Sequence, residues 1–152
     1  MLLRSNNPET TQLIGEAIGK LLEPGDVVSL EGPLGAGKTC MAQGVAKGLG
    51  VDDYITSPSF VFVHEHFGRL PLYHVDAYRI NTADEVLEIG CEEYFYGDGV
   101  TIVEWGDKIE QVLPKEHLKI RIKQIDDERQ IELLGSGEKF KKLVEELTKC
   151  LC

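Results

Sequence analysis

The stretch Gly32-Pro33-Leu34-Gly35-Ala36-Gly37-Lys38-Thr39 reads G-x-x-x-x-G-K-T, the pattern of a loop that binds nucleotide phosphates. Its three glycines allow a tight turn in which successive backbone N–H groups point at phosphate oxygens. Lys38 can reach the outer phosphates as a point charge, and the Thr39 hydroxyl is placed to bind Mg²⁺. This stretch therefore predicts a site for a nucleotide and its magnesium ion.

The residues on either side of the loop support this interpretation. Residues 26–31 form a short apolar run that predicts a buried strand, and residues 39–49 carry apolar side chains at helical spacing. The start of that helix would add its positive dipole end to the phosphate site. The order strand, loop, helix predicts an α/β fold: a P-loop NTPase-like three-layer sandwich with a mixed, mostly parallel sheet.

Composition narrows the class of protein. The 152 residues are a normal length for one domain, 1–152, and the formal net charge of −10 argues against direct binding to nucleic acid. The four cysteines lack metal-ligand spacing, which fits a cytoplasmic protein with reduced thiols. No apolar run approaches the roughly 20 residues that span a bilayer, and no signal peptide is evident, so we expect no membrane contact.

The rest of the chain alternates between helical and strand patterns. The last two strands, with alternating apolar and charged residues, predict a C-terminal antiparallel β-hairpin. The expected helices are one from Asn7-Pro8-Glu9, one after the capping box at 82–85, a short one at 108–112 and one at 138–151. The expected strands are a pair at 60–67 and 70–75, one at 100–103, and the hairpin at 118–123 and 129–133.

Two acids follow predicted strands. Asp76 ends the apolar run at 70–75, and Glu104 follows the run at 100–103. Ligands bind at the carboxyl edge of an α/β sheet, and an aspartate there commonly serves the magnesium site. For Glu104 and its neighbour Trp105, an exposed strand end with a packed indole is the structural alternative.

Two segments leave alternatives open. Residues 52–60 are rich in Ser, Thr and Pro and form either a mobile switch near the outer phosphate or a plain connector. His64, His66 and His74 raise the possibility of zinc, but no cysteine or further carboxylate completes a ligand set.

Taken together, the phosphate loop, Ser57-Pro58-Ser59-Phe60, His74-Val75-Asp76-Ala77-Tyr78-Arg79 and Val103-Glu104-Trp105-Gly106 resemble the bacterial tRNA threonylcarbamoyladenosine biosynthesis ATPase, the TsaE (YjeE) family. The resemblance covers nearly the whole chain. It rests on the order in which the four motifs occur. Ser59 stands where the family pattern usually has threonine, which preserves the hydroxyl.

The resemblance implies an ATPase that supports formation of the threonylcarbamoyl modification on certain tRNAs without transferring the carbamoyl group. It implies ATP and Mg²⁺ as cofactors. It also implies a heterodimer of the transferase subunit and its paralogue as the protein partner, and tRNA contact only through that complex. The absence of an Asn-Lys-x-Asp stretch also favours ATP over GTP.

The resemblance also assigns residues to parts of the site. The catalytic residues would be Lys38, Asp76 and Glu104, with Glu104 also orienting the attacking water. The metal ligands would be Thr39, Asp76 and Glu104. Nucleotide contacts are expected from Thr11, Gly35, Ala36, Gly37, Lys38, Thr39, Cys40, Asp76 and Arg129, and switch or partner-coupling residues from Ser57, Ser59, Tyr78, Arg79 and Trp105.

Two other functions share the loop. A small-molecule or nucleotide kinase needs an acceptor pocket and usually a lid carrying arginines, and the few arginines here are scattered. A non-hydrolysing ATP-sensing module would switch an interaction without cleaving ATP. Within this chain, Arg79 is the best candidate for an arginine that stabilises the charge developing on the phosphates during hydrolysis. Because a missing arginine finger costs about 10³–10⁵ in rate, we expect weak hydrolysis alone and faster hydrolysis with partners.

Overall fold

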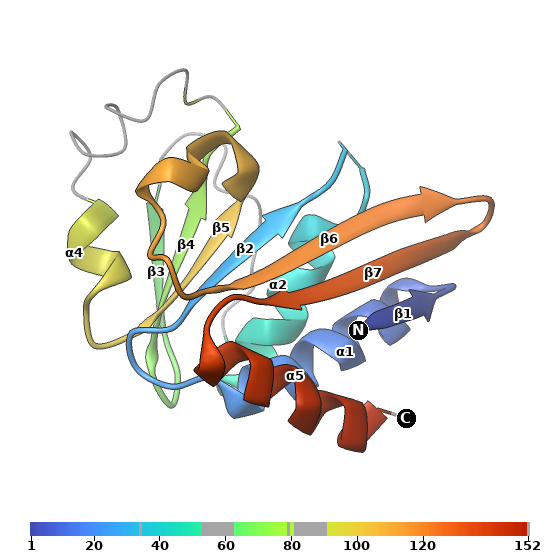
Figure 1. Ribbon diagram of the computed structural model, residues 1–152, viewed down its shortest axis with the longest axis horizontal. Helices are drawn as coiled ribbons and strands as arrows, with labels where there is room; N and C mark the ends of the chain where they lie inside the picture. Colours follow the sequence, from blue (N-terminus) through green and yellow to red (C-terminus); the bar gives the residue numbers. More distant parts are fainter. Residues whose placement is uncertain (34, 53–62, 79, 81–90, 152) are drawn as a thin grey trace.

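The computed structural model describes residues 1–33, 35–52, 63–78, 80 and 91–151. Seven strands form one sheet in the order β1-β7-β6-β2-β5-β4-β3 (Figure 1). The strands are β1 (Leu2–Ser5), β2 (Val27–Glu31), β3 (Val63–Phe67), β4 (Pro71–Asp76), β5 (Val100–Glu104), β6 (Leu118–Ile125) and β7 (Glu128–Gly135).

The sheet is parallel in its centre and antiparallel towards both edges. Strands β6, β2, β5 and β4 are parallel neighbours, whereas β1 with β7, β7 with β6, and β4 with β3 are antiparallel. The expectation of a mixed sheet with a C-terminal antiparallel hairpin is confirmed. The expectation that it is mostly parallel is wrong, because three of these six pairings are antiparallel. The short turns at 68–70 and 126–127 allow only antiparallel neighbours.

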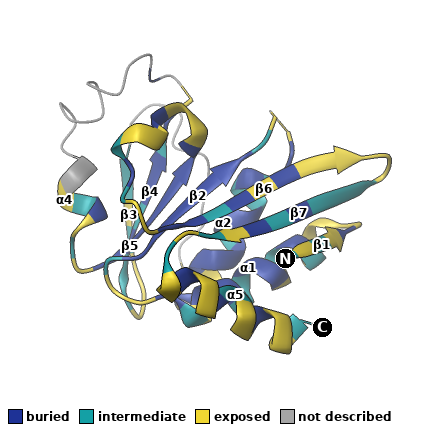
Figure 2. Ribbon diagram, viewed as in Figure 1, coloured by how far each residue is buried: buried dark blue, intermediate teal, exposed yellow. Residues whose placement is uncertain are grey.

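Apolar side chains extend from both faces of the sheet and form a core on each. On one face, Val28 and Ile102 pack with α1, α2 and α5 in the larger core. On the other, their neighbours Val27 and Val103 pack with α4 and η1. Figure 2 shows the central strands buried and the outer half of β6 exposed. The helices are α1 (Pro8–Leu21), α2 (Lys38–Gly48), α4 (Cys91–Phe95), the 3₁₀ helix η1 (Gly106–Val112) and α5 (Glu138–Leu151).

Helices α1 and α2 meet through glycines that leave no room for side chains. A Cβ added at Gly19 would lie 2.2 Å from the Val45 carbonyl oxygen, and one at Gly48 would lie 2.3 Å from the Glu16 carbonyl oxygen. Gly15 and Gly44 are equally crowded, with neighbouring carbonyl oxygens at 2.7 and 2.4 Å. The helix that follows the loop is therefore fixed against α1 by direct contact of the two backbones.

We expect Gly19→Ala to destabilise the protein although alanine favours helices. The added methyl group would force the backbones apart, and overpacking of this kind costs about 1–3 kcal/mol. The gain in helix propensity is only about 1 kcal/mol. Urea unfolding measures the difference, and the exposed neighbour Lys20→Ala is the control. A Gly19→Ala protein as stable as the parent would show that the helices separate at little cost.

Most of the predicted elements are present. Asn7 caps α1 by accepting a hydrogen bond from the Thr10 backbone N–H at 2.7 Å, as its sequence indicated. β1 and the short α4 were not predicted. The helix expected after residues 82–85 lies outside the described residues. In the part of the chain that the structure describes, no helix is long and apolar enough to cross a membrane.

Candidate functional site

The loop between β2 and α2 contains two glycines in a left-handed backbone conformation. Gly35 and Gly37 adopt positive φ angles of 79° and 110°, which favour glycine. A Cβ added at either position would meet nothing within 4 Å, so open space lies in front of both. Such a turn at a helix N-terminus suits a phosphate group, because N–H groups and the helix dipole both face it.

Lys38, which the sequence predicts to reach the outer phosphates, is buried within the loop. Only 5% of its surface is exposed, and its Nζ donates hydrogen bonds to the carbonyl oxygens of Gly32 at 2.7 Å and Pro33 at 2.8 Å. Burial lowers the pKa of Lys38, whereas the nearby carboxylates of Glu104, Asp107 and Asp76 act to raise it. An anion beside Nζ would oppose the effect of burial in the same way as these carboxylates.

Trp105 covers Lys38. Its ring centroid lies 3.9 Å from Lys38 Nζ, within the range of a cation–π contact. The residue has φ 64° and ψ 37°, a left-handed conformation that costs a non-glycine residue roughly 1–2 kcal/mol. The Tyr78 ring packs against Trp105 with the two ring centroids 4.9 Å apart. Trp105 and Tyr78, both predicted to couple the site to partners, thus form one aromatic pair over the loop lysine.

Two polar side chains, from α2 and β4, meet on Glu104. The Thr39 hydroxyl donates to Oε1 of Glu104 at 3.0 Å, and Nε2 of His74 lies 2.5 Å from Oε2. Glu104 is 3% exposed, so it is not the exposed strand end considered as the alternative. Asp76 pairs in register with Glu104 across β4 and β5, and its Oδ1 accepts from the Tyr78 backbone N–H.

A cavity of about 190 Å³ lies on the other side of the loop. It brings together Thr11 from α1, Cys40 from α2 and Arg129 from β7, together with Ala36 and Gly37. These five were predicted to contact nucleotide, and the structure places them around one space. Arg129 also donates to the Gly35 carbonyl oxygen at 3.4 Å, which joins the hairpin to the loop.

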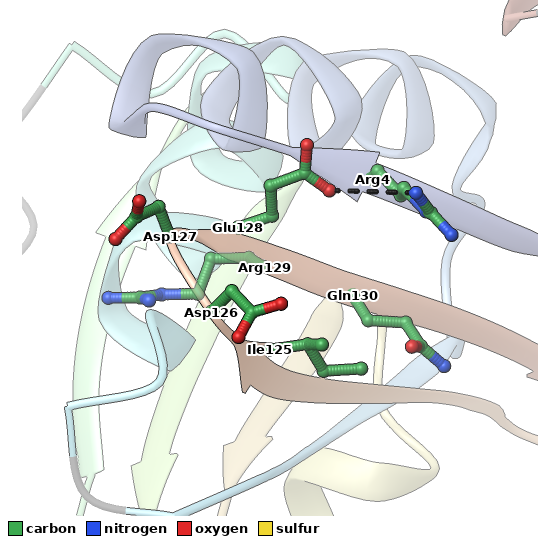
Figure 3. Close-up of a pocket in the computed structure, with 7 residues that line it drawn as sticks. All are labelled: Arg4, Ile125, Asp126, Asp127, Glu128, Arg129 and Gln130. Atoms are coloured by element: carbon green, nitrogen blue, oxygen red, sulfur yellow. Dashed lines mark ion pairs between the residues drawn. The ribbon is translucent and has the colours of Figure 1, made fainter.

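A second hollow opens at the tip of the hairpin, lined by residues of 125–130 and Arg4. Figure 3 shows Arg129 and Asp127 extending to one end of it, while Arg4 pairs with Glu128 at 3.8 Å. Arg129 and Asp127 line both hollows. Asp127 was not predicted as a site residue. It lines the cavity because the hairpin tip reaches the start of α1.

Three predicted residues cannot be placed. Ser57, Ser59 and Arg79 lie outside the described residues. Among the residues that are described, no group of three or more His, Cys, Asp or Glu side chains is arranged to hold a metal, so the three histidines do not form a zinc site there. His74, considered only for zinc, instead contacts Glu104. The alternation of β4 places Leu72, His74 and Asp76 on one face, but the register of β4 against β5, which sets the contact with Glu104, is not visible in the sequence.

A mixed sheet whose central parallel strand leads through a G-x-x-x-x-G-K-T loop into a helix defines the class: α/β proteins built around a glycine-rich loop of this motif. Within that class the chain belongs to the family described as "Threonylcarbamoyl adenosine biosynthesis protein TsaE", which matches residues 5–131. The resemblance drawn from the sequence is thereby confirmed.

Individual relatives agree over most of their length. The tRNA threonylcarbamoyladenosine biosynthesis protein TsaE of Bacillus subtilis is 46% identical over 148 residues, which cover 96% of this chain and 92% of that protein. The protein of the same name from Treponema pallidum is 42% identical, covering 81% and 91%. A crystal structure of Bacillus subtilis YdiB superposes with a TM-score of 0.87 at 42% identity, covering 99% of this chain and 95% of that chain.

Proposed function

We propose that this protein is a Mg²⁺-dependent ATPase of the P-loop NTPase type that supports formation of N6-threonylcarbamoyladenosine in tRNA. It would bind the transferase subunit and its paralogue in the cytoplasm and drive their turnover, touching tRNA only through that complex. Membership of the TsaE family supports the pathway. The observation that carries the ATPase assignment is the hydrogen bond between Thr39 and Glu104 directly beside an open glycine cradle.

The residues present fit both ATP and Mg²⁺. Hard cations prefer oxygen ligands, and the Thr39 hydroxyl and the Glu104 carboxylate already meet, with Asp76 in the next strand. Lys38 is a buried amine that the phosphates would compensate. When bound, Mg²⁺ neutralises charge on the phosphates. Glu104 would hold the attacking water, and the cavity at Thr11, Cys40 and Arg129 would hold the nucleoside.

Phosphate release tests the proposal. It is measured with the protein alone, with the transferase heterodimer, and with the heterodimer and tRNA. We expect slow release alone and faster release with partners. Phosphorylation of a small acceptor in place of free phosphate would identify a kinase. Partner-dependent modification without ATP cleavage would identify the non-hydrolysing module, and rapid turnover unchanged by the heterodimer would contradict partner activation.

We expect Asp76→Asn to weaken nucleotide binding mainly when Mg²⁺ is present. The amide removes a negative charge from the metal side of the site but leaves the phosphate loop intact. Titration of ATP with and without Mg²⁺ measures the two affinities. Asp98→Asn, at an exposed aspartate that bonds Tyr73, is the matched control. Equal losses with and without the metal would exclude Asp76 as a ligand.

We expect ATP to protect Cys40 from alkylation. Burial raises the pKa of this thiol, so its reaction with iodoacetamide should be slow even without nucleotide. Its sulfur lines the proposed nucleoside cavity, so bound ATP would block access. Mass spectrometry follows the rate, with the exposed Cys150 as the internal control. If saturating ATP leaves the Cys40 rate unchanged, the nucleoside does not occupy this cavity.

A further inference from the structure

His74 is a fully buried polar side chain on β4, the strand between β5 and the edge strand β3. None of its surface is exposed, and it lies on the sheet face that α1 and α2 cover, since Leu72 of the same strand face belongs to that core. Strand β5 lies beside β4 (Figure 1). By the register of the two strands, it turns Ile102 and Glu104 to the same face. A polar group buried here is costly unless a hydrogen bond compensates it.

The hydrogen bond that compensates His74 goes to Glu104. Its Nε2 lies 2.5 Å from Glu104 Oε2, and a carboxylate oxygen accepts, so this contact uses the tautomer that carries its proton on Nε2. The other ring nitrogen, Nδ1, is buried and has no hydrogen-bond partner among the described residues. The contact with Glu104 is therefore what orients the ring within the part of the chain that is described.

Glu104 is held at both oxygens from two different elements. Thr39 of α2 donates to Oε1, and His74 of β4 donates to Oε2. Two donors at fixed positions determine how the carboxylate plane is turned. With His74 bonded to Oε2, the oxygen that faces the loop is Oε1. A carboxylate with only the Thr39 contact would be free to rotate about its last bond.

We propose that His74 is a positioning residue for Glu104, holding Oε2 so that Oε1 stays on the side of Thr39 and the loop. The inference rests on the proposed function, because it gives Glu104 a part in hydrolysis. It assigns His74 neither to zinc nor to direct contact with nucleotide. Residues that orient a catalytic or metal-binding side chain in this way typically contribute about 10–100-fold to affinity or activity.

Two amide variants separate positioning from packing. In His74→Gln the side-chain nitrogen can reach the place of Nε2, whereas in His74→Asn it ends near the place of Nδ1, short of Glu104. We expect His74→Asn to lower kcat of the partner-activated reaction by about 10–100-fold with little change in KM, and His74→Gln to recover most of the loss. His74→Leu, which has no donor, should match His74→Asn; if it fails to fold, the amide pair decides.

A crystal structure of each nucleotide-free variant gives a readout that does not depend on activity. The Glu104 carboxylate should keep its contact with Thr39 in His74→Gln and lose it in His74→Asn. The control is His64→Leu, which changes the histidine opposite His74 on β3. Equal kcat for the two amide variants, or an unmoved Glu104 in His74→Asn, would overturn the inference. Wild-type protein that releases no phosphate with its partners would instead overturn the proposed function, and the crystal structures would still test positioning.

Discussion

Lys38→Ala is expected to reduce ATP turnover about 10²–10³-fold, the loss typical of removing one preorganised charge from a transition state. The expectation rests on where the amine lies. It is buried within the loop that would cradle the phosphates and is held by two carbonyl oxygens and an indole ring. Its positive charge would thus lie close to a nucleotide bound in the loop and shielded from water, where electrostatic effects are largest.

The measurement is kcat/KM for phosphate release with partners present, together with ATP affinity by calorimetry. Lys47→Ala is the matched control, because it removes the same charge from an exposed position at the other end of α2. Circular dichroism checks the fold, since the carbonyl oxygens of Gly32 and Pro33 lose a donor. Hydrolysis by Lys38→Ala at the wild-type rate would remove this residue from the mechanism.

Glu104→Gln is expected to lower kcat by about 10²–10⁴-fold, the range for loss of a positioned general base. The amide keeps the size of the side chain but cannot take a proton from water, and it carries no charge towards the metal. Nucleotide binding without Mg²⁺ should change little, because the loop backbone is untouched. This pattern separates Glu104 from Lys38, whose loss should affect binding in both conditions.

Single-turnover phosphate release measures the chemical step directly. The control is Glu110→Gln, the same change at an exposed glutamate of η1 that bonds Lys119. Because His74 also donates to Glu104, the Glu104→Gln protein needs a crystal structure to check that the amide occupies the same place. A Glu104→Gln protein that hydrolyses ATP normally would exclude Glu104 as the base.

The parts of the fold that follow from local pattern could be predicted from sequence. The strand, loop and helix around Lys38 carry their own spacing, and Asn7-Pro8 marks the start of α1. Strand β1 could not be predicted from the sequence. It is only four residues long, Leu2–Ser5, and it pairs with β7, whose residues lie more than 120 positions away. A strand so short gains its stability from its partner and carries no pattern of its own.

The acids of the candidate site could be predicted from the sequence, but the contacts that they make could not. Glu104 and Asp76 each follow an apolar run, so the acids themselves are visible. Which side chain meets Glu104 depends on the register of β4 against β5, which pairs residues about 30 positions apart. Lys38 lies against Trp105, whose left-handed backbone no spacing reveals. The contact of His74 with Glu104 and the burial of Lys38 can therefore be identified only from the three-dimensional structure.

The close contact of α1 and α2 has a consequence for selectivity. One wall of the proposed nucleoside cavity comes from the start of α1 and another from the start of α2, and the glycines bring these two helices into direct backbone contact. We therefore expect that side to keep its width when a different base is bound. A cavity that adapts its shape to a different base must do so on the opposite side, where Asp127 and Arg129 stand at the hairpin tip. Substitution of these two residues is the route by which base preference could be re-engineered.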